Sequence, residues 1–435
     1  MPRPVELGHF VGQMHRAGKL VVQPRMGFAE PARMADGLTA VMNAPASTVG
    51  TITLDSYTRV GDFEGARDAV ERGLSLNGYP IVSHSRETTR NVIASTEGNI
   101  PIQVRHGSPM PGRIFEAMVD LGLAATEGGP VSYCLPYSRT PLAESVVHWR
   151  DAVSQLVDEC RSRELTAHIE TFGGCLLGQM CPPSLLLAVS TLEGLYFVQH
   201  GVTSMSLSYA QQTNPVQDIE ALAALRDLAS SLLPTHVDWH VVLYTYMGVY
   251  PKTAPGALSL LQQSAEVAVR GGAERLIVKT VAEAWRIPTI DENVDALIHA
   301  ARCAEYAGPH STIPWAHEVD YADVLHEARV LIDAVLQLSD DVGTALVKAF
   351  ASGLLDVPFC LHQDNRGLAR AAIDGDGRLQ WSRLGHLPLA PAALPAETTR
   401  LRARGLLRML NYTASCHDQA LTGLRTTRPI TRLDE

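Results

Sequence analysis

Three arginines stand at the ends of short apolar, β-rich segments: Arg25 in VVQPRMG, Arg59 in TLDSYTR and Arg105 in PIQVRHG. A planar guanidinium can bind a carboxylate through two parallel charge-assisted hydrogen bonds, each worth about 1.5–3 kcal/mol. If the three segments are strands of one barrel, their arginines converge on its mouth. This arrangement predicts a binding site for a small substrate that carries more than one negative charge.

Other polar side chains close the remaining predicted strands and would meet the arginines at the same face of a barrel. Lys279 follows the apolar run LIV, where desolvation could lower its pKa enough for Schiff-base chemistry or proton transfer. A lysine that donates hydrogen bonds to a bound cofactor is the alternative. The further strand-end side chains are Asp55, His84, His106, Glu170, Tyr209, Tyr244 and Tyr246.

Glu127 precedes Gly128 and Gly129, which would let its carboxylate and backbone approach a ligand closely. It could anchor a substrate ammonium group or accept a proton from it, or it could be a turn carboxylate in water. Tyr133 and Tyr137 follow in the same irregular stretch, and they either aim hydroxyls at a ligand or seal the barrel top with their rings. We expect this stretch to be an elaborated loop that covers the substrate.

Common metal and nucleotide motifs are missing from the sequence. The sixteen histidines are scattered and no CxxC pair occurs, so we expect no metal site. The chain also lacks GxGxxG, GxxxxGK(S/T) and GxSxG, which cradle phosphates or carry a nucleophilic serine. We therefore expect the difficult chemistry to come from a cofactor that these motifs do not announce.

The composition is that of a globular enzyme, with 46% apolar and 19% charged residues in a chain of 435. A formal net charge of −10 opposes broad binding of nucleic acid or of an anionic membrane. The sequence has neither a signal-peptide-like start nor an apolar run long enough to span a membrane. Seven cysteines without a CxxC pair are typical of reduced thiols, so we expect a cytoplasmic protein.

Short β-branched runs alternate with longer segments of helical spacing, which predicts an α/β fold with parallel strands. Eight strands with intervening helices predict a (β/α)8 TIM barrel over residues 1–310. The expected strands are Leu20–Arg25, Thr48–Asp55, Tyr79–Ser83, Ile102–Arg105, Leu165–Glu170, Thr203–Ser208, His240–Thr245 and Leu276–Lys279. The long gap between the fourth and fifth of these places the Glu127 stretch in an insertion.

The alternation of predicted strands and helices ends at about residue 310. Val319–Leu354 predicts two amphipathic helices, and Asp374–Gly375–Asp376–Gly377 predicts a hairpin turn between short strands. We expect residues 311–435 to form a C-terminal α+β extension, with helices and a hairpin, packed on or beside the barrel.

Six ordered motifs resemble the large catalytic, or epsilon, subunit of glutamate mutase (methylaspartate mutase). They are QPRMG, DSYTR, LNGYP, QVRHG, TEGGPVSYCLPY and KTVAEAWRIPT, and the similarity extends from about residue 20 to 360. The resemblance implies a barrel that works with adenosylcobalamin, which is carried by a separate small subunit with a DxHxxG motif. This chain has no DxHxxG, so a partner is expected, together with pairing of two large chains.

The resemblance also implies roles for individual residues. The catalytic residues would be Glu127 and Arg105, with Glu127 contacting the substrate amino group and Glu170 behind it. The substrate would be bound by Arg25, Arg59, Arg105, His106, Glu127, Tyr133 and Tyr137. The cofactor would be surrounded by Gly27, Asn77, Pro136, Tyr250, Lys279, Glu283 and Ile287.

The expected activity is the radical interconversion of L-glutamate and threo-3-methyl-L-aspartate. Two segments depart from the family pattern: Leu243–Val249 replaces a phenylalanine–histidine–glutamine–tryptophan run, and Gly107–Met110 replaces GTPD. Two alternatives therefore remain. One is a barrel lyase that forms a Schiff base at Lys279 with a dicarboxylate, and the other is a non-catalytic paralogue that binds an amino diacid or a partner chain.

Overall fold

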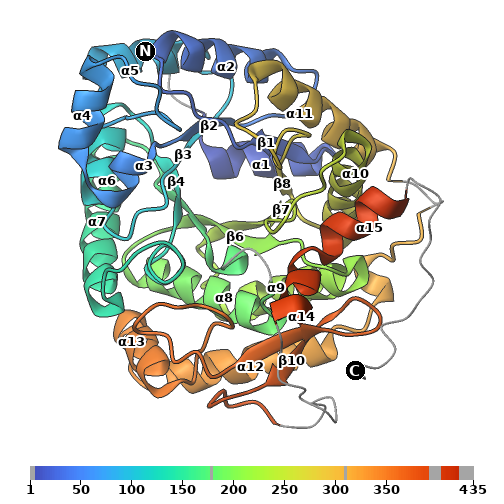
Figure 1. Ribbon diagram of the computed structural model, residues 1–435. Helices are drawn as coiled ribbons and strands as arrows, with labels where there is room; N and C mark the ends of the chain where they lie inside the picture. Colours follow the sequence, from blue (N-terminus) through green and yellow to red (C-terminus); the bar gives the residue numbers. More distant parts are fainter. Residues whose placement is uncertain (1–4, 177–179, 308–310, 391–402, 421–435) are drawn as a thin grey trace.

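Eight parallel strands form a barrel in the computed structural model, which describes residues 5–176, 180–307, 311–390 and 403–420 (Figure 1). Each strand from β2 to β8 pairs with the next, and β8 pairs with β1. A parallel bridge between Val22 and Thr48 links β1 to the chain entering β2 and closes the ring. The predicted (β/α)8 barrel is confirmed. The strands are β1 (Val21–Pro24), β2 (Gly50–Thr53), β3 (Ile102–Arg105), β4 (Ala125–Gly128), β5 (His168–Thr171), β6 (Ser204–Ala210), β7 (Asp238–Tyr244) and β8 (Arg275–Val278).

Helices surround the barrel and cover its outer face (Figure 1). Residues that favour a helix start are present at several of these helices. At the start of α9, the Asn214 side chain caps the helix by accepting hydrogen bonds from the amides of Val216 and Gln217, and Pro215 is the first helical residue. The outer helices are α2 (Pro31–Asn43), α5 (Arg86–Ala94), α6 (Gly112–Asp120), α7 (Leu142–Ser162), α8 (Pro183–Gln199), α9 (Pro215–Leu232), α10 (Ala254–Gly271) and α11 (Ile290–Glu305). Shorter pieces are α3 (Ser56–Val60), α4 (Phe63–Glu71) and the 3₁₀ turn η1 (Gly173–Cys175), while α1 (Leu7–Arg16) contacts β1, β6 and β7.

Two strand predictions were wrong. The run Tyr79–Ser83 forms only an isolated bridge between Tyr79 and Leu54, because Pro80 has no N–H to continue a ladder. The true fourth strand is β4, which the sequence analysis placed in a covering insertion. Glu127 therefore lies on a barrel strand rather than on a loop, and the irregular segment that follows β4 carries Tyr133 and Tyr137.

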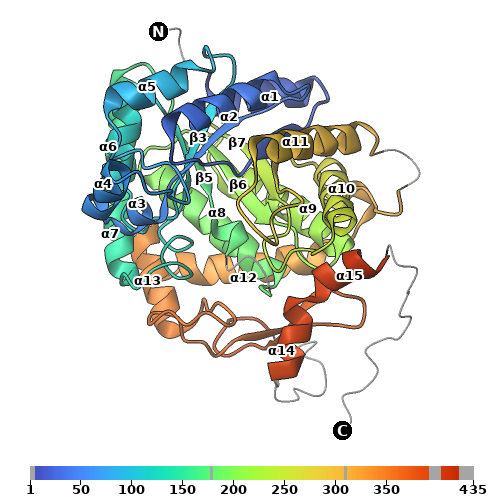
Figure 2. The ribbon, with the colours of Figure 1, turned by 45° about the horizontal axis from the view of Figure 1, so that its top comes forward.

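The C-terminal region packs against the outside of the barrel helices. The two predicted helices are present as α12 (Ala322–Leu336), against α8 and α9, and α13 (Val342–Ser352), against α7 and α8 (Figure 2). The predicted hairpin is also present, with β9 (Arg370–Ile373) and β10 (Leu379–Arg383) antiparallel around a turn at Asp374–Gly377. Farther along, α14 (Ala403–Leu410) leads to α15 (Tyr412–Ala420), which contacts α10. The predicted boundary near residue 310 falls outside the described residues and stays a prediction, as do residues 391–402 and 421–435 of the extension.

None of the described helices is both long and apolar enough to cross a membrane. The seven cysteines are all unpaired. Within the described ranges, no three His, Cys, Asp or Glu side chains come together as metal ligands.

Candidate functional site at the carboxyl ends of the strands

Neighbouring strands bring four polar side chains together inside the barrel mouth. The register pairs Val104 with Thr126, so Arg105 on β3 and Glu127 on β4 are adjacent. Glu127 in turn pairs with Glu170 on β5. Tyr244 ends β7 and reaches across the barrel interior toward all three. We refer to Arg105, Glu127, Glu170 and Tyr244 as the inner cluster.

The inner cluster is tied together by an ion pair and by hydrogen bonds. Arg105 Nε lies 2.8 Å from Glu127 Oε2, and Arg105 Nη2 donates to the Tyr244 hydroxyl at 3.1 Å. That hydroxyl lies 2.7 Å from Glu127 Oε2 and is also bonded to Glu170. Tyr133 donates its hydroxyl to the other oxygen of Glu127. Both carboxylate oxygens of Glu127 are therefore held in place before any ligand binds.

The electrostatics of the cluster favour an ionised Glu127. Burial opposes its charge, but the Arg105 guanidinium and the two tyrosine hydroxyls outweigh this, so the pKa of Glu127 lies below its ordinary value. Burial, reinforced by Glu127, holds the pKa of Tyr133 well above its ordinary range. Burial also raises the pKa of Tyr244. The tyrosines therefore remain donors, and Glu127 remains an acceptor at neutral pH.

Two buried donors at the mouth lack an acceptor within the part of the chain that the structure describes. Arg105 is 5% exposed, and its Nη1 makes no hydrogen bond to any described residue. His106 accepts a hydrogen bond at Nδ1 from the Ser108 amide, which places the proton of the neutral ring on Nε2, and that atom also has no described partner. Burial lowers the pKa of His106 to about 4, so the ring is neutral at pH 7. Buried donors without partners are costly unless a ligand supplies the acceptor.

Arg59 approaches the cluster from α3, after β2. Its Nε donates to the carbonyl of Leu54 at 3.0 Å, which orients the guanidinium, and its aliphatic stem lies close to Gly107. Burial lowers the pKa of Arg59, and the charges of Arg25 and Arg105 act in the same direction. Three like charges are thus close enough to influence one another, an arrangement that an anion would relieve.

The two predicted tyrosines differ in their surroundings. Tyr133 is buried, and its ring packs edge-on against His106 with the centroids 5.0 Å apart. Tyr137 packs against Tyr133 and Phe172 but is 50% exposed. Tyr133 is therefore part of the floor of the mouth, and Tyr137 is at its open rim.

A second group, the outer cluster, consists of Arg25, Lys279, Glu283 and Tyr250. Glu283 Oε1 lies 3.0 Å from both Arg25 Nη1 and Lys279 Nζ. The Lys279 ammonium sits 5.1 Å from the centre of the Tyr250 ring, and the buried Tyr250 hydroxyl has no partner among the described residues. Burial lowers the pKa of Lys279 to about 8, although Glu283 opposes this shift.

The other four predicted cofactor residues belong to neither the inner nor the outer cluster. Gly27 is explained by packing, because a Cβ there would overlap the carbonyl oxygen of Thr53. Asn77 accepts a hydrogen bond from the Ser56 amide at 2.9 Å. Pro136 is half-buried in the segment between Tyr133 and Tyr137, and Ile287 is 55% exposed after β8. Their proposed roles remain predictions.

Sequence reasoning gave no role to Arg275, which supports Glu170 from inside the barrel. Its Nη2 donates to Glu170 and, at 2.8 Å, to Ser206 Oγ, and its Nη1 donates to Gln23. The side chain is fully buried. A charged residue opening the otherwise apolar strand RLIV was the available signal, since such a charge must be paired inside the barrel.

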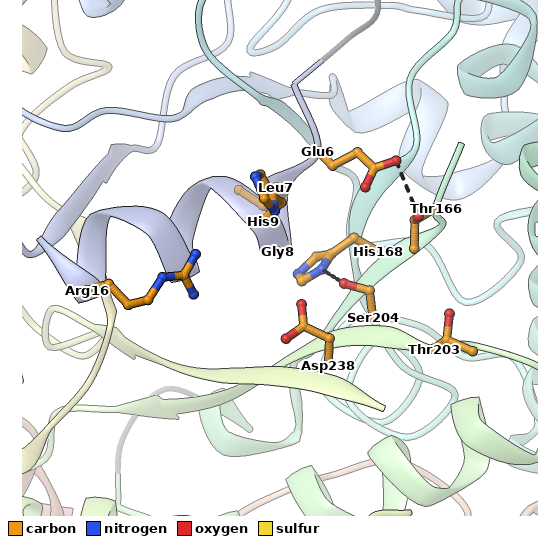
Figure 3. A pocket seen from close by; sticks show the side chains of 11 residues that line it. Glu6, Leu7, Gly8, His9, Arg16, Thr166, His168, Thr203, Ser204 and Asp238 are labelled. Atoms are coloured by element: carbon orange, nitrogen blue, oxygen red, sulfur yellow. Dashed lines mark hydrogen bonds between the residues drawn. The ribbon is translucent and has the colours of Figure 1, made fainter. Parts of the chain in front are cut away.

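A cavity of about 320 Å³ lies at the opposite end of the barrel, between α1 and the starts of β5, β6 and β7 (Figure 3). It is lined by Glu6, His9, Arg16 and Asp238 among others, and His168 there is hydrogen-bonded to Ser204 at 2.9 Å. Barrel enzymes carry out their chemistry at the carboxyl ends of the strands. This cavity is therefore separate from the candidate site.

A (β/α)8 barrel whose arginines, carboxylates and tyrosines gather at the carboxyl ends of its strands has the architecture of a barrel enzyme. The family model of the methylaspartate mutase E chain matches residues 1–423, and the chain belongs to that family. It is therefore an enzyme of the isomerase class, as its resemblance to these mutases led us to expect.

The relatives it matches are similar over most of their length. The glutamate mutase epsilon subunit of Haloarcula marismortui is 32% identical over 404 residues, which cover 91% of this chain and 82% of that protein. The corresponding subunit of Halobacterium salinarum is 30% identical over 402 residues, covering 91% and 83%. That of Desulfitobacterium hafniense is 29% identical over 417 residues, covering 93% and 85%.

Proposed function

We propose that this chain is the substrate-binding subunit of an adenosylcobalamin-dependent isomerase that interconverts L-glutamate and threo-3-methyl-L-aspartate. The observation that carries the proposal is the buried Arg105–Glu127 pair, which leaves Arg105 Nη1 without an acceptor among the described residues at the mouth of a barrel of this family. An amino diacid supplies both a carboxylate for the free donor and an ammonium for the ionised Glu127. The same chemistry favours a cytoplasmic enzyme of amino-acid metabolism.

Substrate binding would divide between the arginines and the inner cluster. Arg105 Nη1 and His106 Nε2 would donate to one carboxylate, while Arg59 and Arg25 would neutralise the other. Glu127 would hold the ammonium, because its charge is already favoured by Arg105 and two hydroxyls. A mouth closed around the ligand would exclude water, which protects reactive intermediates.

The outer cluster fits the polar part of an adenosyl group. Lys279 is a buried donor near the Tyr250 ring, and the Tyr250 hydroxyl lacks a partner among the described residues. Glu283 pairs with both cations through Oε1, and its Oε2 would accept hydrogen bonds from ribose hydroxyls. Adenosylcobalamin, when bound, would supply a carbon radical by homolysis of its cobalt–carbon bond. The contribution of Lys279 and Glu283 would be to hold and orient this group.

Exposed apolar side chains at the rim of the mouth are the basis for proposing a partner subunit. Apolar side chains project from the segments that follow β3, β4 and β8, and Trp285 and Ile287 are 66% and 55% exposed. Exposed apolar groups gathered around a site mark a surface that another molecule covers. The others are Met110 and Tyr137, with Leu361 from the C-terminal region. We propose that a small cobalamin-binding subunit with a DxHxxG motif docks here, in an assembly with two large chains.

Proton NMR tests the proposal directly. L-glutamate is incubated with this chain, a cobalamin-binding small subunit and adenosylcobalamin, with each component omitted in turn. A new methyl doublet that requires all three components is expected. Assembly and cofactor binding without product would count against glutamate as the substrate, and other amino diacids would then be screened.

One observation favours a second candidate function. The pKa of Lys279, lowered to about 8 by burial, suits Schiff-base formation with a keto acid. The ion pair with Glu283 favours the protonated ammonium, which is not nucleophilic. Borohydride reduction in the presence of a keto acid, followed by mass spectrometry, decides between the two. A covalent adduct at Lys279 would support a lyase, and we expect none. A purely binding paralogue is disfavoured by the complete inner cluster.

A further inference from the structure

Glu193 is a fully buried carboxylate on α8 that lies outside the inner cluster. Four donors from two separate segments converge on it. Its Oε1 accepts from the amides of Val131 and Ser132 at 3.2 and 2.9 Å, and its Oε2 accepts from Ser132 Oγ at 3.0 Å and from the Phe172 amide at 3.3 Å. All four partners are N–H or O–H groups, so the geometry suits an acceptor-only, ionised carboxylate.

The two segments that Glu193 joins carry the residues around Glu127. Ser132 is the immediate neighbour of Tyr133, whose hydroxyl donates to Glu127. The Phe172 ring lies 5.0 Å from that of Tyr133 and 5.5 Å from that of Tyr244, measured between centroids. Tyr133 therefore directly follows a residue that Glu193 holds, and Tyr244 packs against the ring of Phe172, whose amide Glu193 also holds.

The local sequence is adapted to this carboxylate. A Cβ at position 129 would overlap the Glu193 carboxyl group, so Gly129 is required for the segment to approach it. Burial raises the pKa of Glu193 to about 7, while the amide and hydroxyl donors oppose the shift. An apolar side chain of similar size would fill this space without the cost of burying a carboxylate, but it could not accept the four hydrogen bonds.

We infer that Glu193 is a positioning residue, which holds the segment after β4 so that the Tyr133 hydroxyl stays on Glu127. The inference rests on the proposed function, because it assigns Glu193 to the same site. Glu193 does not touch the substrate. It acts by fixing amides in the segments that follow two neighbouring strands, β4 and β5.

The test compares Glu193→Gln with a matched buried carboxylate. Asp218 on α9 is also fully buried, accepts from the Tyr209 hydroxyl at 2.8 Å and the Gln212 amide at 2.9 Å, and has its pKa raised to about 7 by burial. Asp218→Asn therefore reproduces the loss of a buried charge without touching the Tyr133 segment. If Glu193→Gln does not fold, Glu193→Asp replaces it in the test. This variant keeps the carboxylate but has a side chain one methylene shorter, so it reaches the four donors less well.

The first measurement is hydrogen exchange on the chain alone, which needs no activity. In Glu193→Gln, the amides of Val131 and Ser132 should exchange about tenfold faster, because a neutral amide oxygen is a weaker acceptor than a carboxylate and the amide NH₂ cannot accept at all. In Asp218→Asn those amides should exchange at the wild-type rate. Unchanged exchange in Glu193→Gln would overturn the inference.

The second measurement is a double-mutant cycle for turnover with Tyr133→Phe, using the assembled enzyme. Glu193→Gln should lower kcat about tenfold in the wild-type chain but less than about twofold in the Tyr133→Phe chain, since the hydroxyl it positions is already gone. If the two substitutions lowered kcat independently, so that their fold-changes multiplied in the double variant, the inference would be overturned and Glu193 would be a structural residue. A wild-type chain without turnover would instead count against the proposed function, while the exchange result still stands.

Discussion

The Nε atom of Arg105 lies 2.8 Å from Oε2 of Glu127, and the two side chains are 5% and 3% exposed. A buried ion pair gains strength from the low dielectric around it but gives up hydration on both sides. Here the pair also leaves Arg105 Nη1 without an acceptor among the described residues, although the same side chain contacts Glu127 and Tyr244. Because a buried donor without an acceptor lowers stability, we propose that a ligand supplies the acceptor.

Replacing Arg105 with lysine should reduce kcat/KM about 100-fold while the barrel stays folded. An ammonium can pair with Glu127, but it cannot also reach Tyr244 and present a free donor to a carboxylate. Losing one charge-assisted hydrogen bond to a ligand costs about 1.5–3 kcal/mol. Steady-state kinetics measure the effect, and circular dichroism confirms the fold.

The control for this substitution is Arg378→Lys. Arg378 also pairs with a buried carboxylate, Glu220, but it lies in the C-terminal hairpin. Its replacement should leave kcat/KM within about twofold of the wild-type value. Near-normal turnover of Arg105→Lys would remove Arg105 from the substrate site.

Replacing Tyr244 with phenylalanine should lower kcat about 10- to 100-fold with little change in the fold. The variant removes the hydroxyl that accepts from Arg105 and whose single proton is shared between Glu127 and Glu170, so the two buried carboxylates lose one donor between them. Such a loss costs about 1–3 kcal/mol. Single-turnover kinetics with the assembled enzyme would measure it.

Tyr196→Phe provides the matched control for Tyr244. Tyr196 is equally buried, and its hydroxyl donates to the carbonyl of Val146 at 2.6 Å, outside the inner cluster. It should lose stability without losing turnover per folded molecule. If the two variants had the same kcat, Tyr244 would be a structural residue.

The sequence predicted the barrel and its arginines but not the position of Glu127. Three of the four residues in β4, ATEG, have low strand propensity, so the segment reads as a loop. It is a strand because β3 and β5 pair with it on both sides, which is a long-range effect. Tyr79–Ser83 shows the opposite error, since an apolar run with a proline has strand composition but no ladder.

The helix α8 shows why the spacing of apolar residues in the sequence does not predict every helix. Almost every residue from Pro183 to Phe197 is buried, because the barrel lies on one side and α12 on the other. A helix that is apolar all round has no amphipathic signal. The sequence therefore offered no pattern that marks Glu193 as a buried polar residue. Arg105 could be predicted because a charged residue at the end of an apolar strand indicates a site by itself.

Cofactor binding should weaken as the pH rises through about 8. Burial lowers the pKa of Lys279 to about 8, so the ammonium that would donate to the adenosyl group loses its proton above this pH. Lys279→Arg should remove the pH dependence, because a guanidinium stays charged. Adenosylcobalamin affinity, titrated spectroscopically with the small subunit present, measures this, and an affinity that is constant between about pH 7 and 9 would contradict it.

Folding stability should respond to Lys279 in the opposite direction. Between about pH 8 and 10.5 the unfolded chain binds a proton at this lysine that the folded chain has released. The contribution of Lys279 to the free energy of unfolding therefore rises with pH over that window. Denaturant titrations of the wild type and Lys279→Met at several pH values would measure the difference in slope.

Gly27→Ala should destabilise the chain even when no cofactor is present. A methyl group at position 27 would overlap the carbonyl oxygen of Thr53, where neither backbone can move freely, so we expect a loss of about 2 kcal/mol or more. The control is Gly112→Ala at the start of α6, where a Cβ meets no atom within 4 Å and alanine should be neutral or stabilising. Thermal unfolding of both variants without ligand measures this. If Gly27→Ala kept the wild-type Tm and lost only adenosylcobalamin binding, the glycine would be required by the cofactor rather than by its contact with β2.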